Sequence, residues 1–168
     1  MEQNEGRKPL NEQDKIFMRE AIDLSLKGMK NGEGGPFGCV VVNSKGAIIG
    51  YGNNRVLSTN DPTAHAEVVA IRDACRNIGT FQLEGCTIYT SCEPCPMCLG
   101  AIYWARPARL VYACTRKDAA AIDFDDDFLY KELKTPVTKR KILTLQVLRK
   151  EALVAFKEWK DKSNKTRY

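Results

Sequence analysis

Long apolar stretches are absent from this sequence. No run of apolar residues approaches the roughly 20 residues that a membrane-spanning helix requires, so we expect no membrane contact. The N-terminal segment Met1–Asn11 is polar and lacks the apolar core of a secretion signal. These absences together predict a cytoplasmic protein whose residues 1–11 are disordered.

Histidine is also scarce, whereas cysteine is not. His65 is the only histidine among 168 residues, and the seven cysteines are an odd number in a chain without a secretion signal. This argues against a disulfide framework and makes clustered cysteines candidates for metal ligands or redox groups. Three of the seven lie within Cys92–Cys98. We expect the other four to pack in the core as small apolar residues: Cys39, Cys75, Cys86 and Cys114.

The composition is that of an ordinary globular protein. The chain is 43% hydrophobic and 28% charged, and its length suits one hydrophobic core rather than two. We therefore predict a single domain over residues 1–168. The net charge of +5 is uneven, because 12 Lys/Arg and 4 Asp/Glu residues lie from Lys131 onward, which makes that segment +8 and the rest of the chain −3. Such a basic segment either binds nucleic acid or forms the solvated face of a helix.

Apolar periodicity and turn residues predict alternating helices and strands. Gly38–Asn43 and Ala47–Gly52 flank the turn residues Ser44–Gly46, which indicates a β-hairpin. Strands separated by helices follow, and this order predicts an α/β layered fold. The predicted helices are Lys15–Lys30, Ala64–Asn77, Pro96–Ala105 and one that begins at Leu148, and the remaining predicted strands are Cys86–Thr90, Arg109–Ala113 and Ile142–Val147.

One histidine and two cysteines have the spacing of a metal site. Proline is favoured at the first position of a helix, so Pro96 places Cys95 just before a helix and Cys98 in its first turn. Residues three apart share a helix face, so both sulfur atoms can reach one ion, and the helix N-terminus favours their thiolate forms. Together with His65 they form a set of nitrogen and sulfur ligands that suits zinc and leaves a fourth position for water.

Glu67, two residues after His65, is the candidate proton carrier. Zinc-bound water ionises near neutral pH and becomes a nucleophile, but a neighbouring group must still carry its proton. Residues two apart do not share a face within a regular helix. Either the pair therefore lies at the start of a helix, or Glu67 approaches the bound water from the side.

The same cysteines allow two other interpretations. A structural zinc site formed by Cys92, Cys95, Cys98 and His65 has acceptable spacing, but it gives Glu67 no purpose. A redox-active pair at Cys95 and Cys98 has no support elsewhere in the sequence.

The pattern H-x-E at His65–Glu67 followed by P-C-x-x-C at Pro94–Cys98 resembles the signature of the cytidine deaminase-like superfamily of zinc deaminases. The resemblance implies a three-layer α/β/α fold with a mixed five-stranded sheet. It also implies one Zn2+ per chain, held by His65, Cys95 and Cys98, and Glu67 as the catalytic proton carrier. The substrate stays open, because the superfamily acts on cytosine, cytidine, guanine, guanosine, deoxycytidylate and adenosine in tRNA.

Several blocks outside this signature resemble the bacterial guanine deaminases. They are Gly34–Gly38, Asn54, Asp61–Glu67, Thr90–Arg106, Asp118–Ala120, Phe124–Glu132 and the terminal Tyr168. The implied reaction converts guanine and water to xanthine and ammonia. A water activated by zinc attacks C2 of the purine, while Glu67 transfers its proton to N3 and then to the leaving amine.

This resemblance also implies a substrate-binding set. Asn54 and Asp126 would bind the purine, Trp104 would form an aromatic wall, and Tyr168 would close the pocket. Guanine presents donors at N1 and at its 2-amino group, for which a carboxylate is the natural acceptor. Without the resemblance, an acidic turn such as Asp123–Asp127 is more often solvated and a lone tryptophan is more often part of a core. The implied set is completed by Ala66 and Phe37.

Two rival enzymes and one non-enzymatic function share these motifs. A guanosine deaminase needs only a roomier pocket. A tRNA adenosine deaminase shares Asp61–Glu67 and would use the basic C-terminal segment to bind RNA. The acidic run Asp125–Asp127, expected near the pocket, would repel a phosphate backbone, so we do not expect a nucleic-acid partner. A structural zinc module is the third alternative.

The resemblance finally implies a homodimer. The C-terminal helix and tail, residues 148–168, would be exchanged between the two subunits, so that Tyr168 closes the pocket of the neighbouring chain.

Overall fold

The computed structural model describes residues 9–167, which divide into two units. The first unit lies within Met1–Asp126 and contains the sheet, and the second is Asp127–Tyr168. Across the described part of the chain, none of the helices has both the length and the apolar character that crossing a bilayer requires.

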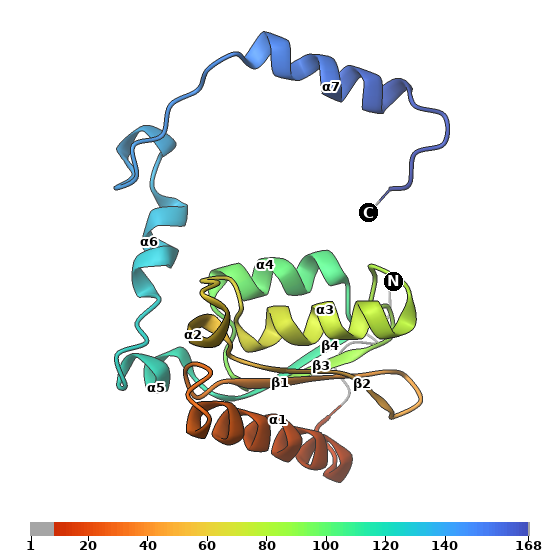
Figure 1. Cartoon of the computed structure of the whole chain (residues 1–168), viewed down its shortest axis with the longest axis vertical. Coiled ribbons are helices and arrows are strands. Elements are labelled where there is room, and N and C mark those ends of the chain that lie inside the picture. The colour runs from red at the N-terminus through yellow and green to blue at the C-terminus, as the bar shows by residue number, and fades with distance from the viewer. Residues whose placement is uncertain (1–8, 168) are drawn as a thin grey trace. The chain divides into compact units, whose positions relative to one another are not determined.

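A mixed sheet forms the centre of the first unit (Figure 1). Its strands are β1 (Gly38–Val42), β2 (Ile48–Asn53), β3 (Thr87–Cys92) and β4 (Arg109–Cys114), in the order β2-β1-β3-β4. β1 pairs antiparallel with both β2 and β3, whereas β3 and β4 are parallel. The connection between the two parallel strands contains α4 (Pro96–Ala105), because parallel neighbours need a crossover.

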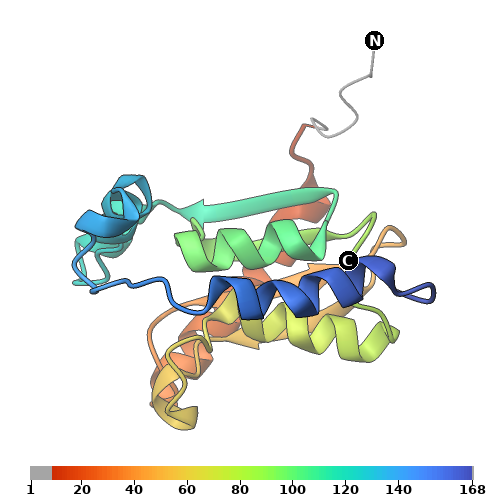
Figure 2. The same ribbon diagram turned by 90° about the horizontal axis from the view of Figure 1, so that it is seen from above.

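Helices cover both faces of this sheet, which makes the expected three layers. α1 (Glu12–Lys30) packs on one face, and α3 (Ala66–Ile78) and α4 cover the other (Figure 1). Figure 2 shows α3 and α4 side by side. The short helices α2 (Val56–Thr59) and α5 (Arg116–Ala120) lie in the loops after β2 and β4.

The sheet has four strands, so the expected fifth strand is a wrong prediction. Residues 142–147 are apolar and β-branched enough to suggest a strand, but they adopt irregular structure. A strand is stabilised by side-chain contacts and hydrogen bonds with its neighbours, and residue preference alone supplies neither.

Successive side chains of β1 point to opposite faces of the sheet and contribute to a hydrophobic core on each face. Val40 and Val42 belong to the core under α1, whereas Cys39 and Val41 belong to the core under α3 and α4. α3 lies directly against β2. A Cβ atom at Gly52 would lie 2.2 Å from the carbonyl oxygen of Ala66, so only glycine allows this approach.

α1 begins at Glu12, three residues before the predicted start. Asn11 caps the helix, and its side chain accepts the N–H of Asp14 at 3.0 Å, while the Asp14 carboxylate accepts the N–H of Asn11 at 2.9 Å. This reciprocal capping box satisfies two N–H groups that a helix start otherwise leaves unpaired. Asn11 therefore belongs to the helix cap, and residues 1–8 of the predicted disordered segment lie outside the described residues.

The carboxylate of Asp14 also joins α1 to the sheet. It accepts a hydrogen bond from the Tyr89 hydroxyl at 2.6 Å and one from Arg109 at 3.1 Å. Burial acts to raise the pKa of Asp14, but the hydrogen bonds from Arg109 and Tyr89 outweigh it and lower that pKa. Burial, assisted by the hydrogen bond to Asp14, raises the pKa of Tyr89 to about 12.

The second unit has helices but no core of its own. It contains α6 (Asp127–Lys134), the 3-10 helix η1 (Val137–Lys139) and α7 (Arg149–Asp161), and none of its described residues is buried. α7 begins one residue after the predicted start, because Leu148 is a left-handed N-cap with φ 53°. The most exposed apolar side chains of this unit, each at least 78% exposed, are Ile142, Leu143, Leu145 and Val147.

Candidate metal centre

A tight turn holds His65 at the start of α3. The carboxylate of Asp61 accepts the backbone N–H of Thr63 at 2.8 Å and its hydroxyl at 2.7 Å, and the N–H of His65 donates to the carbonyl of Thr63 at 2.8 Å. His65 is then the N-cap residue in extended conformation, and α3 begins at Ala66. The predicted helix began two residues too early, because the sequence pattern did not separate the cap from the first turn.

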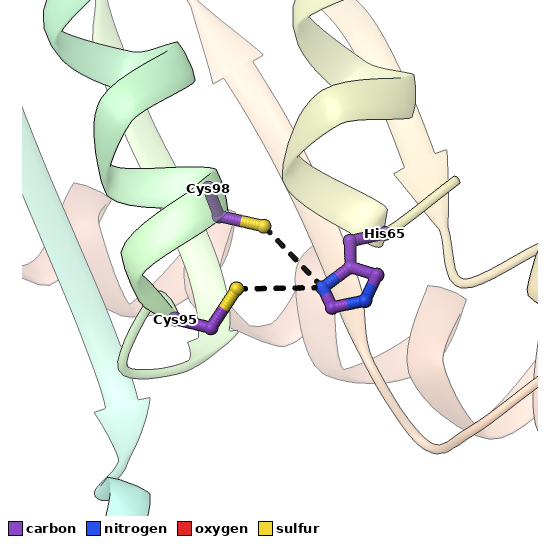
Figure 3. Close-up of side chains that lie close together, drawn as sticks. All are labelled: His65, Cys95 and Cys98. Atoms are coloured by element: carbon purple, nitrogen blue, oxygen red, sulfur yellow. Dashed lines mark hydrogen bonds between the residues drawn. The ribbon is translucent and has the colours of Figure 1, made fainter. Parts of the chain in front are cut away.

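Cys95 and Cys98 occupy the corresponding place on α4. Cys95 is the N-cap residue, Pro96 follows at the first helical position, and Cys98 lies buried in the first turn. This confirms the boundary predicted from Pro96. The starts of α3 and α4 thus direct one imidazole and two thiols toward the same point (Figure 3).

The three side chains have the separations of a zinc site. The Nδ1 atom of His65 lies 3.6 Å from the Sγ of Cys95 and 3.5 Å from the Sγ of Cys98, and all three ligand atoms lie within 4.8 Å of one another (Figure 3). Tetrahedral zinc, with bonds of about 2.0 Å to nitrogen and 2.3 Å to sulfur, would place these atoms about 3.6 Å apart. The residues therefore fit a zinc ion with three protein ligands.

The two sulfur atoms differ in their affinity for a proton. The hydrogen bond from Cys98, followed by that from His65, lowers the pKa of Cys95 to about 4 against the opposing effect of burial. The hydrogen bond with Cys95, together with the burial of the Cys98 side chain, raises the pKa of Cys98 far above its usual range. Zinc binds sulfur as the thiolate, so a bound cation would displace the proton that Cys98 retains more strongly than Cys95.

Glu67 lies beside these ligands and is almost fully buried, at 6% exposed. Its carboxyl group hydrogen-bonds the side chain of Cys98, and burial raises the pKa of Glu67. A carboxyl whose pKa is raised toward neutrality is suited to take up and release a proton. Because His65 is the N-cap and Glu67 follows in the first turn of α3, the pair lies at a helix start, the first of the two arrangements considered.

Cys92 lies outside this group. Its thiol donates to the carbonyl oxygen of Thr115 at 3.6 Å, and burial raises the pKa of Cys92 to about 12, which disfavours the thiolate that binds metal. The metal-ligating set formed by described residues is His65, Cys95 and Cys98, and this geometry disfavours the four-ligand structural site. Among the cysteines expected in the core, Cys39 and Cys86 are buried, whereas Cys114 is exposed, so that prediction was wrong for Cys114.

Comparison with known proteins decides the family. Residues 11–114 match the cytidine and deoxycytidylate deaminase zinc-binding region, a stretch that includes both helix starts and all three ligands. The chain belongs to this deaminase family. The family binds zinc, so the metal of the centre is zinc, and the chain is a hydrolase.

Proteins similar to this deaminase include enzymes named for different substrates. A guanine deaminase of Bacillus subtilis is 53% identical over 152 residues, which cover 90% of this chain and 97% of that protein. The X-ray structure of guanine deaminase from B. subtilis has a TM-score of 0.89 and covers 95% of this chain and 99% of that chain at 51% identity. A tRNA-specific adenosine deaminase of Buchnera aphidicola is 43% identical over 105 residues, 62% of this chain and 68% of that protein.

Asp126 is distant in sequence from the zinc ligands and is half-buried. Burial, followed by the negative charge of Cys95, raises the pKa of Asp126. The role of Asp126 in substrate binding stays a prediction.

Asn54 follows β2 directly and is buried, at 5% exposed. Its side-chain oxygen accepts the N–H of Val56 at 3.1 Å, and its own N–H donates to the carbonyl of Phe37 at 3.0 Å. Ala66 is fully buried between His65 and Glu67, and its side chain packs in the core. The roles of Asn54, Ala66 and Phe37 in binding stay predictions.

Trp104 and Tyr168 are the two remaining residues of the predicted pocket. Trp104 lies near the end of α4, six residues after Cys98 and hence roughly 9 Å along the helix axis, and it is 65% exposed. Its role as an aromatic wall stays a prediction. Tyr168 lies outside the described residues.

Sequence reasoning missed the residues that support the predicted binding set. Glu33 accepts a hydrogen bond from the Asn53 amide at 2.7 Å, next to Asn54. Phe124 packs edge-on against Phe37, with ring centroids 4.9 Å apart. The only available signal was the position of each beside a predicted binding residue, because no local pattern reports a contact between distant loops.

Proposed function

We propose that this chain is a zinc-dependent guanine deaminase, which hydrolyses guanine to xanthine and ammonia. The observation that carries the proposal is the similarity to the B. subtilis guanine deaminase, which is 53% identical over 90% of this chain. A deaminase needs a polar side chain that recognises its substrate base. A carboxylate can accept hydrogen bonds from both N–H donors of guanine. The B. subtilis guanine deaminase supports the same substrate, because its similarity extends through Asp126.

Zinc, when bound, supplies a Lewis acid that lowers the pKa of a water molecule toward neutrality. Glu67 accepts one proton from the attacking water at its carboxylate and delivers it to N3 of the purine, and it then accepts a second proton from the oxygen bonded to C2 and delivers it to the 2-amino group. A C–O bond forms at C2, the C2–N bond breaks, and ammonia leaves. Burial raises the pKa of Glu67, which favours the uptake of a proton by its carboxylate.

Asp126 and Asn54 orient the base. Asp126 accepts hydrogen bonds from N1–H and from the 2-amino group, and these donors stabilise the carboxylate charge that burial disfavours. Asn54 offers a donor and an acceptor for the imidazole side of the purine. Trp104 stacks on the base as an aromatic wall.

RNA is disfavoured as the substrate. The similarity to the Buchnera tRNA-specific adenosine deaminase spans 62% of this chain, whereas that to the B. subtilis guanine deaminase spans 90%. The acidic residues Asp125 and Asp126 would repel a phosphate backbone near the zinc centre.

The active form is a homodimer whose C-terminal segments are exchanged. None of the described residues of the second unit is buried, and apolar side chains at 142–147 and on α7 are exposed, so this unit needs a covering surface. A second copy of the chain supplies it, and Tyr168 then closes the neighbour's pocket. A reducing compartment such as the cytoplasm keeps Cys95 and Cys98 available as zinc ligands.

An ammonia-release panel tests the substrate. Guanine, guanosine, cytosine, cytidine, adenine and a tRNA are each incubated with the zinc-loaded protein, and guanine should give the highest kcat/KM. Asp126→Ala should lower guanine kcat/KM by about 10- to 150-fold, because charge-assisted hydrogen bonds of about 1.5–3 kcal/mol are lost. Zinc content and Tm should stay unchanged. A higher rate with tRNA, or an Asp126→Ala variant that gains tRNA turnover, would indicate that the substrate is RNA rather than guanine.

A further inference from the structure

We infer that Phe124 is a positioning residue that holds the segment carrying Asp126 in place by docking on Gly35 and Phe37. The inference rests on the proposed role of Asp126 in guanine binding. It adds a contact between two loops that neither the zinc motif nor the proposed reaction contains.

The docking contact is close and directional. The rings of Phe124 and Phe37 meet edge-to-face, with centroids 4.9 Å apart and an interplanar angle of 87°. A Cβ atom added at Gly35 would lie 2.7 Å from the Cζ atom of Phe124 and 3.0 Å from the Cε2 atom of Phe37. The Phe124 ring therefore lies on the backbone of Gly35, and a side chain at position 35 would displace the ring.

The segment before Asp126 is attached to another loop near its start and is folded on itself near its end. Near its start, the N–H of Arg116 donates to Glu93 at 3.1 Å, and Glu93 lies in the loop that carries Cys95. Near its end, the N–H groups of Ile122 and Phe124 both donate to the carbonyl of Ala119, at 3.1 and 3.0 Å, which forms a turn within the segment. The Phe124 ring, two residues before Asp126, then connects this turn to Phe37 in a different loop.

Asp126 needs such an anchor. A loop without an anchor would let the carboxylate move out to water, away from the base that it has to bind. Phe124 itself is 45% exposed, so it adds little to the buried core, and its main contact is the one that fixes this loop.

Kinetics of Phe124→Ala test the consequence for the reaction. The variant should lower guanine kcat/KM on the order of 10- to 100-fold, mainly through KM, because a small displacement of a binding group has effects of this size. Zinc content should be unchanged, and Phe124→Tyr, which keeps the ring, should restore most of the loss. Phe81→Ala is the matched control, because Phe81 is similarly exposed, at 50%, and follows the far end of α3. Wild-type KM in Phe124→Ala, or an equal effect in the control, would overturn the inference.

A double-mutant cycle tests whether Phe124 acts through Asp126. In an Asp126→Ala background, Phe124→Ala should change kcat/KM by less than about twofold, because the group that it positions is already gone. Gly35→Ala should reproduce the Phe124→Ala effect and should not add to it. Independent, additive effects of Phe124→Ala and Asp126→Ala would contradict the positioning role.

Hydrogen exchange tests the anchor without reference to guanine. Loss of the Phe124 ring should accelerate exchange of the Ile122 and residue-124 amides at least tenfold, while amides of α3 stay unchanged. Unchanged exchange in this segment would overturn the inference even if activity falls. Conversely, if Asp126→Ala keeps full guanine turnover, the proposed guanine contact fails, and the exchange rates still decide whether Phe124 anchors the loop.

Discussion

Proton transfer at the zinc centre depends on one buried carboxyl group, that of Glu67. Glu67→Gln keeps the shape and the hydrogen-bonding capacity of the side chain but cannot carry a proton. We therefore expect normal zinc content and Tm, with kcat reduced by at least about 10²–10⁴-fold, the usual contribution of a general acid–base group. Ammonia release and metal analysis on the same preparation measure both. Turnover within tenfold of wild type would refute the assigned role.

Serine substitutions distinguish the cysteines that bind zinc from the neighbouring Cys92. Cys95→Ser and Cys98→Ser should each lose most of the one zinc ion per chain, because each removes a sulfur that lies near His65. Cys92→Ser should keep it, since the Cys92 thiol points to the Thr115 carbonyl instead. Metal content after dialysis measures the difference, and zinc loss in Cys92→Ser would favour the four-ligand structural site.

At the level of single residues, the sequence predicted the groups that act on the metal but not those that support substrate binding. His65, Cys95 and Cys98 could be identified because a helix start with Pro96 fixes their geometry locally. The contact of Phe124 with Gly35 and Phe37 could not, since it joins loops that only the folded sheet brings together.

At the level of elements, α1 is fixed to the sheet by a buried group of titratable side chains. The pKa of Tyr89 is raised from its usual 10 to about 12 in the folded state. Its contribution to the free energy of unfolding is therefore fully present below pH 10 and is lost as the pH rises through 12. The shift corresponds to about 2–3 kcal/mol.

Tyr89→Phe isolates this effect. Wild type should lose about 2–3 kcal/mol more of its free energy of unfolding between pH 9.5 and 12 than the variant does, because phenylalanine does not titrate. Urea unfolding at a series of pH values measures the difference. The contribution of the Asp14 carboxylate to the free energy of unfolding depends on pH in the opposite direction. Its pKa is lowered, so its contribution is present above the ordinary pKa and is lost as the pH falls through the lowered value. Parallel curves for wild type and Tyr89→Phe would contradict the Tyr89 assignment.

Elements were predictable where local signals were strong. Pro96 gave the start of α4, and turn residues gave the β1–β2 hairpin. Asn11 and Asp14 carried a capping signal that the apolar pattern alone did not use, which explains the late predicted start of α1. The strand expected at 142–147 failed for a different reason, because a strand depends on a partner that the sequence does not specify.

At the scale of the whole molecule, the second unit is the part that the proposed dimer would cover with another chain. The first unit holds the zinc ligands, Glu67 and Asp126, whereas the second exposes apolar side chains and has no buried residue among those described. A unit of this kind gains stability by covering a surface elsewhere. The proposed exchange of C-terminal segments makes each pocket depend on two chains, and this dependence can be measured.

Deleting Thr166–Tyr168 should reduce guanine turnover while zinc content and Tm stay nearly unchanged, because a closing residue excludes water and positions the base without holding the fold together. Mixing truncated chains with full-length Glu67→Gln chains then separates exchange from closure within one chain. If segments are exchanged, a mixed dimer has one pocket with an intact Glu67 and a complete tail from its partner, so activity should partly return. If each tail serves its own pocket, both pockets of the mixed dimer are defective and activity stays low. Subunit exchange has to be confirmed by mass spectrometry of the mixed dimer. Low activity after confirmed exchange would count against the exchanged arrangement, and full activity of the truncated enzyme would remove Tyr168 from the pocket altogether.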